Sequence, residues 1–446
     1  MKKKLNSSIA LLFLIMLVAF IVRATYNRWD YMGESTPADY GYEASQIAAS
    51  IATGHGFGNP YPLIHTGASA LMPPVYIYLL AGIFKVFGVH STASYLAATT
   101  LTGLFSTLIC IPIFFLGKRA AGDAAGLGAA AFWAIFPSGV MLTAGAISGV
   151  WDSALTALLA AFVLLATLRV RDSDRTAAWI GYGLLCALSL ETSPTILSVL
   201  PFLFLWLAWH LYQHRRKWLR LPAVAAVMIV LGCAPWAARN WFTFHQFIPF
   251  RSNFGLELWL GNNQYEDHNL FPDARSPYTS WIDTRRMAEV GEIAFMREKK
   301  AQALEHIETH RLETLHSVYM RFIVIWTGTS VRVKDVWPMM TWPNRIAFGI
   351  NALLVVCGWA GLWAMFRLRS PLAWPFFAYL AFYPAVYYVT HATLRYRHPV
   401  DPALTVLASY AIACAVRAVA RRNTWFYRAP GLTTRSGAIS GSPISQ

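Results

Sequence analysis

Charged side chains are scarce in this sequence. Only 13% of its 446 residues are Asp, Glu, Lys or Arg, whereas 56% are hydrophobic. A chain with so few charges cannot cover a water-exposed surface, and its apolar residues gather in runs near the length that crosses a bilayer. The composition therefore excludes an ordinary soluble domain and indicates an all-α polytopic membrane protein.

Cysteines are few, and the common binding signatures of enzymes are absent. The five cysteines all fall inside apolar segments, where a cysteine is usually a small core residue and not half of a disulfide. No zinc motif, Gly-rich nucleotide loop or dinucleotide signature is present, so neither a nucleotide sugar nor ATP is expected as the direct substrate. His55, His65 and Asp39 are scattered without ligand spacing, so no metal site or cofactor is assigned, and dependence on a divalent ion is left open.

Positive charge is in excess, with a formal net charge of +15. Most Lys and Arg residues flank hydrophobic segments, which is the distribution of cytoplasmic loops in membrane proteins. The excess therefore points to membrane lipids as partners and argues against nucleic acid. The 18 Trp, 20 Tyr and 27 Phe residues suit interfacial belts and contact with sugars or lipids.

The first apolar run, Ile9 to Val22, follows Lys2, Lys3 and Lys4. A signal peptide cleaved near Ala24 is the alternative, but we interpret the run as an uncleaved first span with a cytoplasmic N-terminus. Together with it, we expect about ten transmembrane helices and both termini inside. The other nine are expected at 94–117, 122–140, 149–168, 177–190, 194–212, 221–236, 344–366, 372–389 and 400–418.

Pro73 to Gly88 is apolar but short, and it carries Lys85. If this segment crossed the membrane, every basic cluster between the later spans would move outside, against the charge rule. We therefore predict an outer juxtamembrane or re-entrant helix.

The chain is expected to form one membrane domain over residues 1–422, with a first outer loop at 28–92 and one long outer region at 239–343. The Ser-, Gly- and Arg-rich tail at 423–446 is expected to be disordered and cytoplasmic.

An acidic helix is predicted at 37–53 in the first outer loop. Pro37 suits a first helical turn and Gly54 suits a helix end. Asp39 and Glu43 would then lie one turn apart on one face, with an apolar stripe facing the membrane surface. The pair is a candidate general base, in which Glu43 would raise the pKa of Asp39 by like-charge repulsion. The alternative is a pair of solvated carboxylates.

Three other places carry charges near spans. Asp152 would lie at the start of the fourth span. The helix dipole favours a carboxylate there, so a structural role is expected. Glu191 would lie at an outer turn, where a charge near a span is by default a functional candidate, and the alternative is an exposed loop residue. The stretch THATLRYRHPVDP (Thr390 to Pro402) places Arg395, Arg397 and His398 in a short outer loop, where cations violate the charge rule. For at least one of the arginines we favour binding of a lipid phosphate, and the alternative is an Arg–Asp or Arg–Glu pair. His398 is either an acid, base or ligand, or a hydrogen-bonded loop residue.

The order of these motifs resembles a known family. An acidic outer helix follows one span, then come PPVY ending in FG, PWAARN, RSNFGLELWLGNN and LRYRHPVDP. Over nearly the whole chain up to the last helix, this order is similar to the bacterial branch of the C-type integral-membrane glycosyltransferases. That branch is similar to dolichyl-phosphate-mannose protein mannosyltransferases and to lipid A aminoarabinose transferases. The two longest motifs are the most specific, and the first contains Arg251, Asn253 and Glu257.

The resemblance implies a C-type glycosyltransferase fold and a polyprenyl-monophosphate sugar donor, used at the periplasmic face of a bacterial inner membrane. Asp39 matches the family's catalytic aspartate, and Asp152 matches its acidic residue at the fourth span. Aminoarabinose transferases have a Lys before the PP pair, and Met72 stands there in this chain. Contacts to the donor phosphate are therefore expected from Arg395, Arg397 and, more weakly, Lys85. Supporting roles are expected for Arg251, Asn253, Glu257, Asp152 and His398.

The predicted function is transfer of a sugar to an acceptor that is a protein, a lipid or a glycan. One alternative is a ligase or polymerase of the O-antigen type that uses a polyprenyl-diphosphate donor. The other is a flippase for a lipid-linked sugar, which would need a polar pathway through the membrane core that the predicted spans lack.

Overall fold

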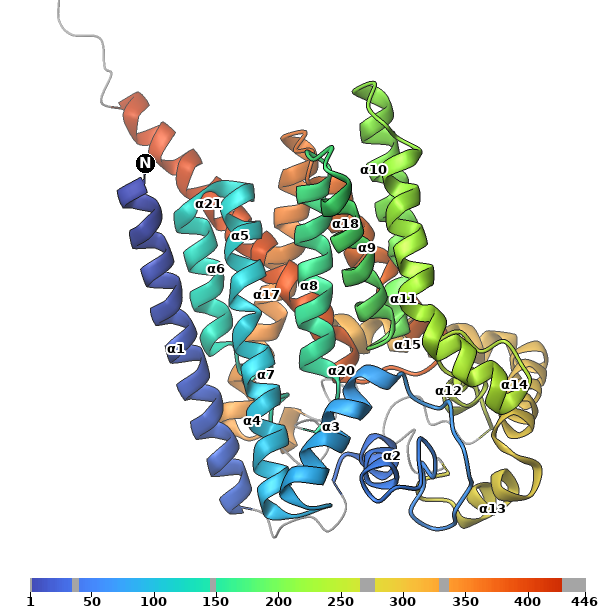
Figure 1. Ribbon diagram of the computed structural model, residues 1–446. Coiled ribbons are helices and arrows are strands. Elements are labelled where there is room, and N and C mark those ends of the chain that lie inside the picture. The colour runs from blue at the N-terminus through green and yellow to red at the C-terminus, as the bar shows by residue number, and fades with distance from the viewer. Residues whose placement is uncertain (1, 34–39, 145–149, 265–276, 329–336, 427–446) are drawn as a thin grey trace, which may run out of the picture.

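The computed structural model describes residues 2–33, 40–144, 150–264, 277–328 and 337–426. Within these residues nearly all regular structure is helical, and the only β-pairing is an isolated bridge between Gly58 and Ala68. Figure 1 shows a bundle of roughly aligned helices with a smaller group of helices at one end of it. The expected all-α membrane architecture is thus confirmed.

In the part of the chain that the structure describes, six helical segments are long and apolar enough to cross a membrane. They are Ser7–Tyr31 within α1 (Lys2–Gly33), Thr92–Ala121 across α4 (Thr92–Leu108) and α5 (Cys110–Ala121), α8 (Ser153–Val170), α11 (Arg220–Phe244), α17 (Trp342–Arg367), and Arg395–Ala420, most of which belongs to α21 (Asp401–Phe426).

The other expected spans form shorter helices in the same bundle (Figure 1). They are α6 (Asp123–Ile135), α9 (Thr176–Leu190), α10 (Leu200–Gln213) and α18 (Ala373–Phe382). Prolines explain part of the shortening, since Pro137 starts the separate helix α7 (Pro137–Met141) and Pro194 starts the 3-10 turn η1 (Pro194–Ser198). The number ten therefore stays a prediction.

The smaller group comes from the two segments that the sequence predicts to lie outside, the first outer loop and the long outer region, and it is therefore called the outer group. It contains α2 (Tyr42–Ala52), α3 (Pro74–Phe87), α12 (Phe254–Gly261), α13 (Trp281–Val290), α14 (Glu292–Thr309) and α15 (Arg311–Thr327). Four further short elements lie among the described residues: η3 (Trp337–Met339), α19 (Ala385–Val389), α20 (Leu394–Arg397) and η4 (His398–Val400).

The acidic helix begins later than expected. Gly41 adopts a left-handed conformation with φ of 82°, so α2 starts at Tyr42 and not at residue 37. Asp39 lies outside the described residues, and Glu43 is in the first turn of α2. The apolar face is also placed differently, because Ala44, Ile47 and Ala48 are buried in a cluster with residues of α3 and not against lipid.

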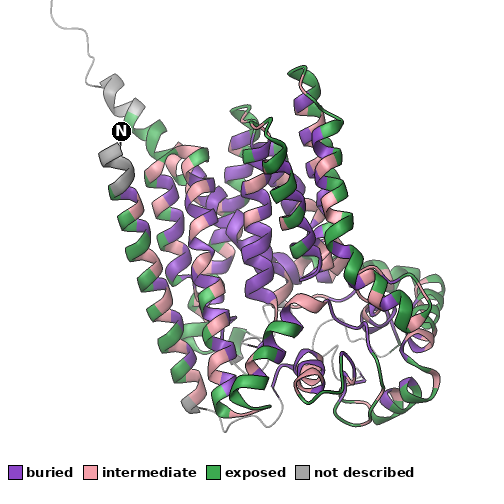
Figure 2. Ribbon diagram, in the orientation of Figure 1, coloured by how far each residue is buried: buried purple, intermediate pink, exposed green. Residues whose placement is uncertain are grey.

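A buried arginine fixes α1 to the bundle. Figure 2 shows α1 with exposed residues along much of its length, yet Arg23 is fully buried. Its guanidinium donates to Ser106 Oγ at 2.8 Å, to the carbonyls of Ala134 and Trp133 at 2.9 and 3.1 Å, and to Ala19 O at 3.1 Å. Because a cation in a span is costly unless its donors are satisfied, these bonds account for its presence there.

Replacement of this arginine should loosen the bundle. Arg23→Met keeps a long apolar side chain but leaves Ser106 and three carbonyl groups without this donor, so we expect the free energy of unfolding to fall by about 2–4 kcal/mol. Thermal unfolding of the full chain in detergent measures the change, and Arg28→Met, at an exposed position of the same helix, is the control. Equal midpoints for the two variants would contradict this role of Arg23.

Candidate functional site

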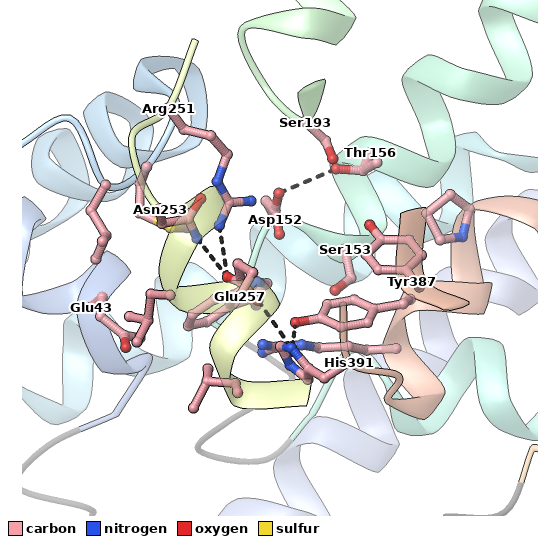
Figure 3. Close-up of a pocket in the computed structure, with 18 of the residues that line it drawn as sticks. Glu43, Asp152, Ser153, Thr156, Ser193, Arg251, Asn253, Glu257, Tyr387 and His391 are labelled. Atoms are coloured by element: carbon pink, nitrogen blue, oxygen red, sulfur yellow. Dashed lines mark hydrogen bonds and ion pairs between the residues drawn. The ribbon is translucent and has the colours of Figure 1, made fainter. Parts of the chain in front are cut away.

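A cavity lies where the bundle meets the outer group of helices. Its volume is about 90 Å³, and α2, α8, α12 and the segment around residues 383–399 all contribute to its walls. Figure 3 shows side chains from these separate elements converging on one space. Its charged or titratable lining includes Glu43, Asp152, Arg251, Glu257, His391 and Arg395.

Two glycines allow helix α12 to pack very closely against its neighbours. A Cβ on Gly255 would lie 2.0 Å from Met296 O, and a Cβ on Gly261 would lie 1.7 Å from Thr390 O. No side chain fits at either position, because α12 runs directly against α14 on one side and against residue 390 on the other. The sequence FGLELWLG therefore fixes where Glu257, in the middle of α12, points.

Glu257 joins three parts of the cavity wall. Its Oε1 accepts from Arg251 Nη2 at 3.1 Å and from Asn253 Nδ2 at 2.5 Å, and its Oε2 lies 3.1 Å from His391 Nδ1. Burial raises the pKa of Glu257, but the contact with His391 and the positive charges of Arg251 and Arg395 outweigh burial and lower it to about 2. Glu257 is therefore a permanent anion and an anchor, and it is unsuited to act as a base near neutral pH.

Asp152 occupies a different electrostatic environment. It precedes α8, and its side chain does not cap that helix but accepts a long contact of 3.4 Å from Thr156 Oγ1. Burial raises the pKa of Asp152, against the opposing charges of Arg395 and Arg251. A carboxyl group whose pKa moves toward neutrality is suited to accept a proton.

Two guanidinium groups face the same cavity. Arg395 lies over the indole ring of Trp151, with 4.1 Å between Cζ and the ring centroid. Arg251 donates to Glu257 through Nη2, while its buried Nε has no acceptor among the described residues. Since planar guanidinium groups suit bidentate contact with phosphate, this pair can hold an anion.

Other predicted residues lie elsewhere. Arg397 is fully buried outside the cavity lining, where its Nε donates to Asp401 at 2.9 Å and its Nη2 to Asn351 at 2.6 Å. Its surroundings match the ion-pair alternative. His398 is buried next to it, stacked on Trp133 and 3.7 Å from Asp401. Lys85 is on the exposed side of α3 and does not line the cavity.

One of the two interpretations of Glu191 is wrong. Glu191 is buried and not an exposed loop residue. The turn that carries it is held between helices, since Glu191 O accepts from Val75 N at the start of α3.

The sequence reasoning missed His391 and Tyr396. Both line the cavity, and His391 Nε2 lies 3.0 Å from the Tyr396 hydroxyl. Tyr396 also stacks on Tyr387 at 4.3 Å between ring centroids, so tyrosines form one wall. Both belong to the unusual stretch Thr390 to Pro402, whose arginines, His398 and Asp401 are its more conspicuous residues. Among the described residues no group of three His, Cys, Asp or Glu side chains is arranged to hold a metal ion.

Comparison with known proteins places this geometry in context. Residues 72–238 match the family model described as dolichyl-phosphate-mannose-protein mannosyltransferase, a range that contains Asp152 but not Arg251 or Arg395. No curated protein matches the chain in sequence.

Two solved structures resemble this chain in fold. The Archaeoglobus fulgidus oligosaccharyltransferase AglB, in complex with an inhibitory peptide and a dolichol-phosphate, matches 97% of this chain and 53% of its own with a TM-score of 0.58 and 16% identity. The apo form of the oligosaccharyltransferase from the same organism matches 94% of this chain and 52% of its own, with a TM-score of 0.57 and 15% identity.

The chain has the C-type glycosyltransferase fold. The resemblance predicted from the motifs is thereby confirmed. ArnT from Cupriavidus metallidurans bound to undecaprenyl phosphate is more distant, with 13% identity, a TM-score of 0.48, and coverage of 92% of this chain and 63% of its own. The chain spans about half the length of the archaeal structures that it matches.

The lowered pKa of Glu257 predicts a pH dependence of stability. Because the folded pKa of about 2 lies below the ordinary 4.5, the stabilisation by Glu257 is present above about pH 4.5 and is lost as pH falls toward 2. Glu257→Gln should therefore unfold at a lower temperature than the wild type at pH 7, and the gap should shrink as pH falls from 4.5 toward 2. Thermal unfolding in detergent across this range measures the gap. A gap that stays constant down to pH 2.5 would contradict the assignment.

Proposed function

We propose that this protein is a glycosyltransferase that moves a sugar from a polyprenyl-monophosphate donor to an acceptor outside the cytoplasm. The observation that carries the proposal is the cavity where the spans meet the outer helices, because its lining includes Asp152 together with Arg251 and Arg395, whose charges act on Asp152. A lipid phosphate at a membrane surface can reach such a place, and the fold and the partial family match support the same chemistry.

Arg251 and Arg395 bind the donor phosphate in this proposal. Arg395 is held against Trp151, and Glu257 accepts a hydrogen bond from Nη2 of Arg251, whose Nε has no acceptor among the described residues. Both guanidinium groups are thus positioned before the donor arrives, which favours stabilisation of the charge that develops on the leaving phosphate. Tyr387 and Tyr396 offer aromatic faces beside this position for the apolar side of a sugar ring.

Transfer requires one proton to leave the acceptor. The acceptor oxygen or nitrogen attacks the anomeric carbon, the bond from that carbon to the phosphate oxygen breaks, and its electron pair stays on the departing polyprenyl phosphate. The proton of the acceptor passes to a carboxylate. Asp39 stays the predicted base from the sequence, with Glu43 in the cavity wall near the start of α2, and Asp152 is the described carboxylate best placed to assist.

The proposed setting is the inner membrane of a bacterium, with both termini in the cytoplasm and the cavity facing the periplasm. A diphosphate-dependent ligase would share the two arginines, so the headgroup of the donor separates it from this proposal. A flippase would move the lipid-linked sugar without breaking its glycosidic bond.

A sugar-transfer assay tests whether Asp39 is the general base. Purified full chain in lipid is given radiolabelled sugars on polyprenyl monophosphate or diphosphate, together with a membrane extract as the acceptor source. We expect transfer from a monophosphate donor, loss of transfer in Asp39→Asn, and a strong reduction in Asp152→Asn. Full activity of Asp39→Asn would refute it as the base, and transfer from diphosphate donors alone would support the ligase.

Donor dependence tests the phosphate contacts. Because a charge-assisted hydrogen bond contributes about 1.5–3 kcal/mol, Arg395→Gln should raise the KM for the donor by about 10- to 100-fold. The KM for the acceptor should change little. Arg285→Gln, on an exposed part of α13, is the control. An equal rise in both KM values would indicate a structural role for Arg395 instead.

A further inference from the structure

Helix α15 presents an apolar face that nothing in the described chain covers. Leu312, Leu315, Tyr319 and Phe322 are exposed by 84%, 64%, 58% and 44%. Their spacing of three, four and three residues places all of them on one side of the helix. A continuous exposed face of this kind marks an interaction surface, since scattered apolar residues would not repeat at the helical period.

The opposite face of α15 is fixed to the protein. Arg321 is buried, donates to the carbonyl of Gly261 at the end of α12, and lies 3.2 Å from the carbonyls of Tyr388 and Val389. Ser317, one turn earlier, is buried on the same side. The helix therefore cannot rotate to bury its apolar face within the chain.

The apolar face ends next to a membrane span. Phe322 contacts Trp326 with 6.4 Å between ring centroids, and Trp326 contacts Trp359 of α17 at 5.2 Å. Trp359 is followed along α17 by exposed Trp363 and preceded by exposed Val356, as expected for a span that faces lipid. Only the buried ring of Trp326 therefore separates the exposed face of α15 from the lipid-facing side of α17.

We propose that α15 is a membrane-docking helix, whose Leu312–Leu315–Tyr319–Phe322 face lies in the phospholipid leaflet on the cavity side of the bilayer. Tyr319 suits the boundary between headgroups and acyl chains, because its ring is apolar and its hydroxyl is polar. Arg311, at the start of the helix, suits the anionic headgroups above that boundary. Apolar area buried in the interface supplies the binding energy.

Docking has a structural consequence for the cavity. Arg321 braces the end of α12 and residues 388–389, and these two segments carry Glu257 and lead to His391. The docked helix therefore holds the cavity at the membrane surface. That a lipid-borne substrate arrives there rests on the proposed function, whereas the docking itself does not.

Photo-crosslinking tests the docking without any assay of transfer. The photoreactive residue benzoylphenylalanine replaces Leu315 or Tyr319 in the full chain, which is reconstituted in nanodiscs of tritiated phosphatidylethanolamine and phosphatidylglycerol. Both positions are exposed, so the larger side chain displaces no packed neighbour. Benzoylphenylalanine at Arg285, an exposed position of α13, is the matched control.

After illumination we expect the variants at Leu315 and Tyr319 to carry several-fold more tritium than the Arg285 control. Labelling at the control level would show that the face lies in water and would overturn the proposal. A crosslinked dimer in place of lipid label would also overturn it, because a second copy of the chain would then cover the face. Thermal unfolding of each variant verifies that it is folded. Because two separate positions are tested, the experiment still gives an answer if one of the two variants does not fold.

Discussion

The ion-pair cluster around Glu257 is the constraint on which the rest of the cavity depends. One carboxylate receives Arg251 and Asn253 from the segment before α12 and contacts His391 from a segment more than 130 residues later in the chain. Removing the carboxylate would leave the half-buried guanidinium of Arg251 and the buried ring of His391 without the acceptor that they share, which costs more than a surface pair contributes. Glu257 thereby fixes the orientation of Arg251 and ties the outer helices to the bundle.

Close backbone packing makes this cluster possible. Gly255 and Gly261 let α12 lie directly against α14 and residue 390, and Arg321 of α15 then closes the end of α12. A second buried carboxylate, Glu292 at the start of α14, accepts from Ala70 N at 2.8 Å and from Ser252 Oγ at 2.6 Å. The first outer loop and the long outer region are therefore built onto each other, and the cavity forms at their junction with the spans.

Much of this arrangement could be predicted from sequence, because a lipid bilayer restricts the length and composition of the segments that cross it. Apolar run lengths and charge placement indicated the helical membrane architecture, and the motif RSNFGLELWLGNN contains Arg251, Asn253 and Glu257, which the structure brings together. The direction of single side chains in turns was harder to predict. Arg395 and Arg397 are two residues apart, yet only Arg395 faces the cavity, since Arg397 pairs with Asp401 one helical turn later. That four-residue spacing was visible in the sequence. The conformation of Gly41 and the burial of Glu191 depend on tertiary contacts that no local pattern encodes.

The central claim is that the cavity holds the phosphate of a lipid carrier between two arginines. The most direct measurement is an electron cryo-microscopy map of the full chain in nanodiscs that contain a polyprenyl monophosphate. The account predicts phosphate density between Arg251 and Arg395, next to Asp152, with Glu257 still paired to Arg251. Phosphate density at Arg397 or Lys85, with the cavity between Arg251 and Arg395 empty, would contradict it.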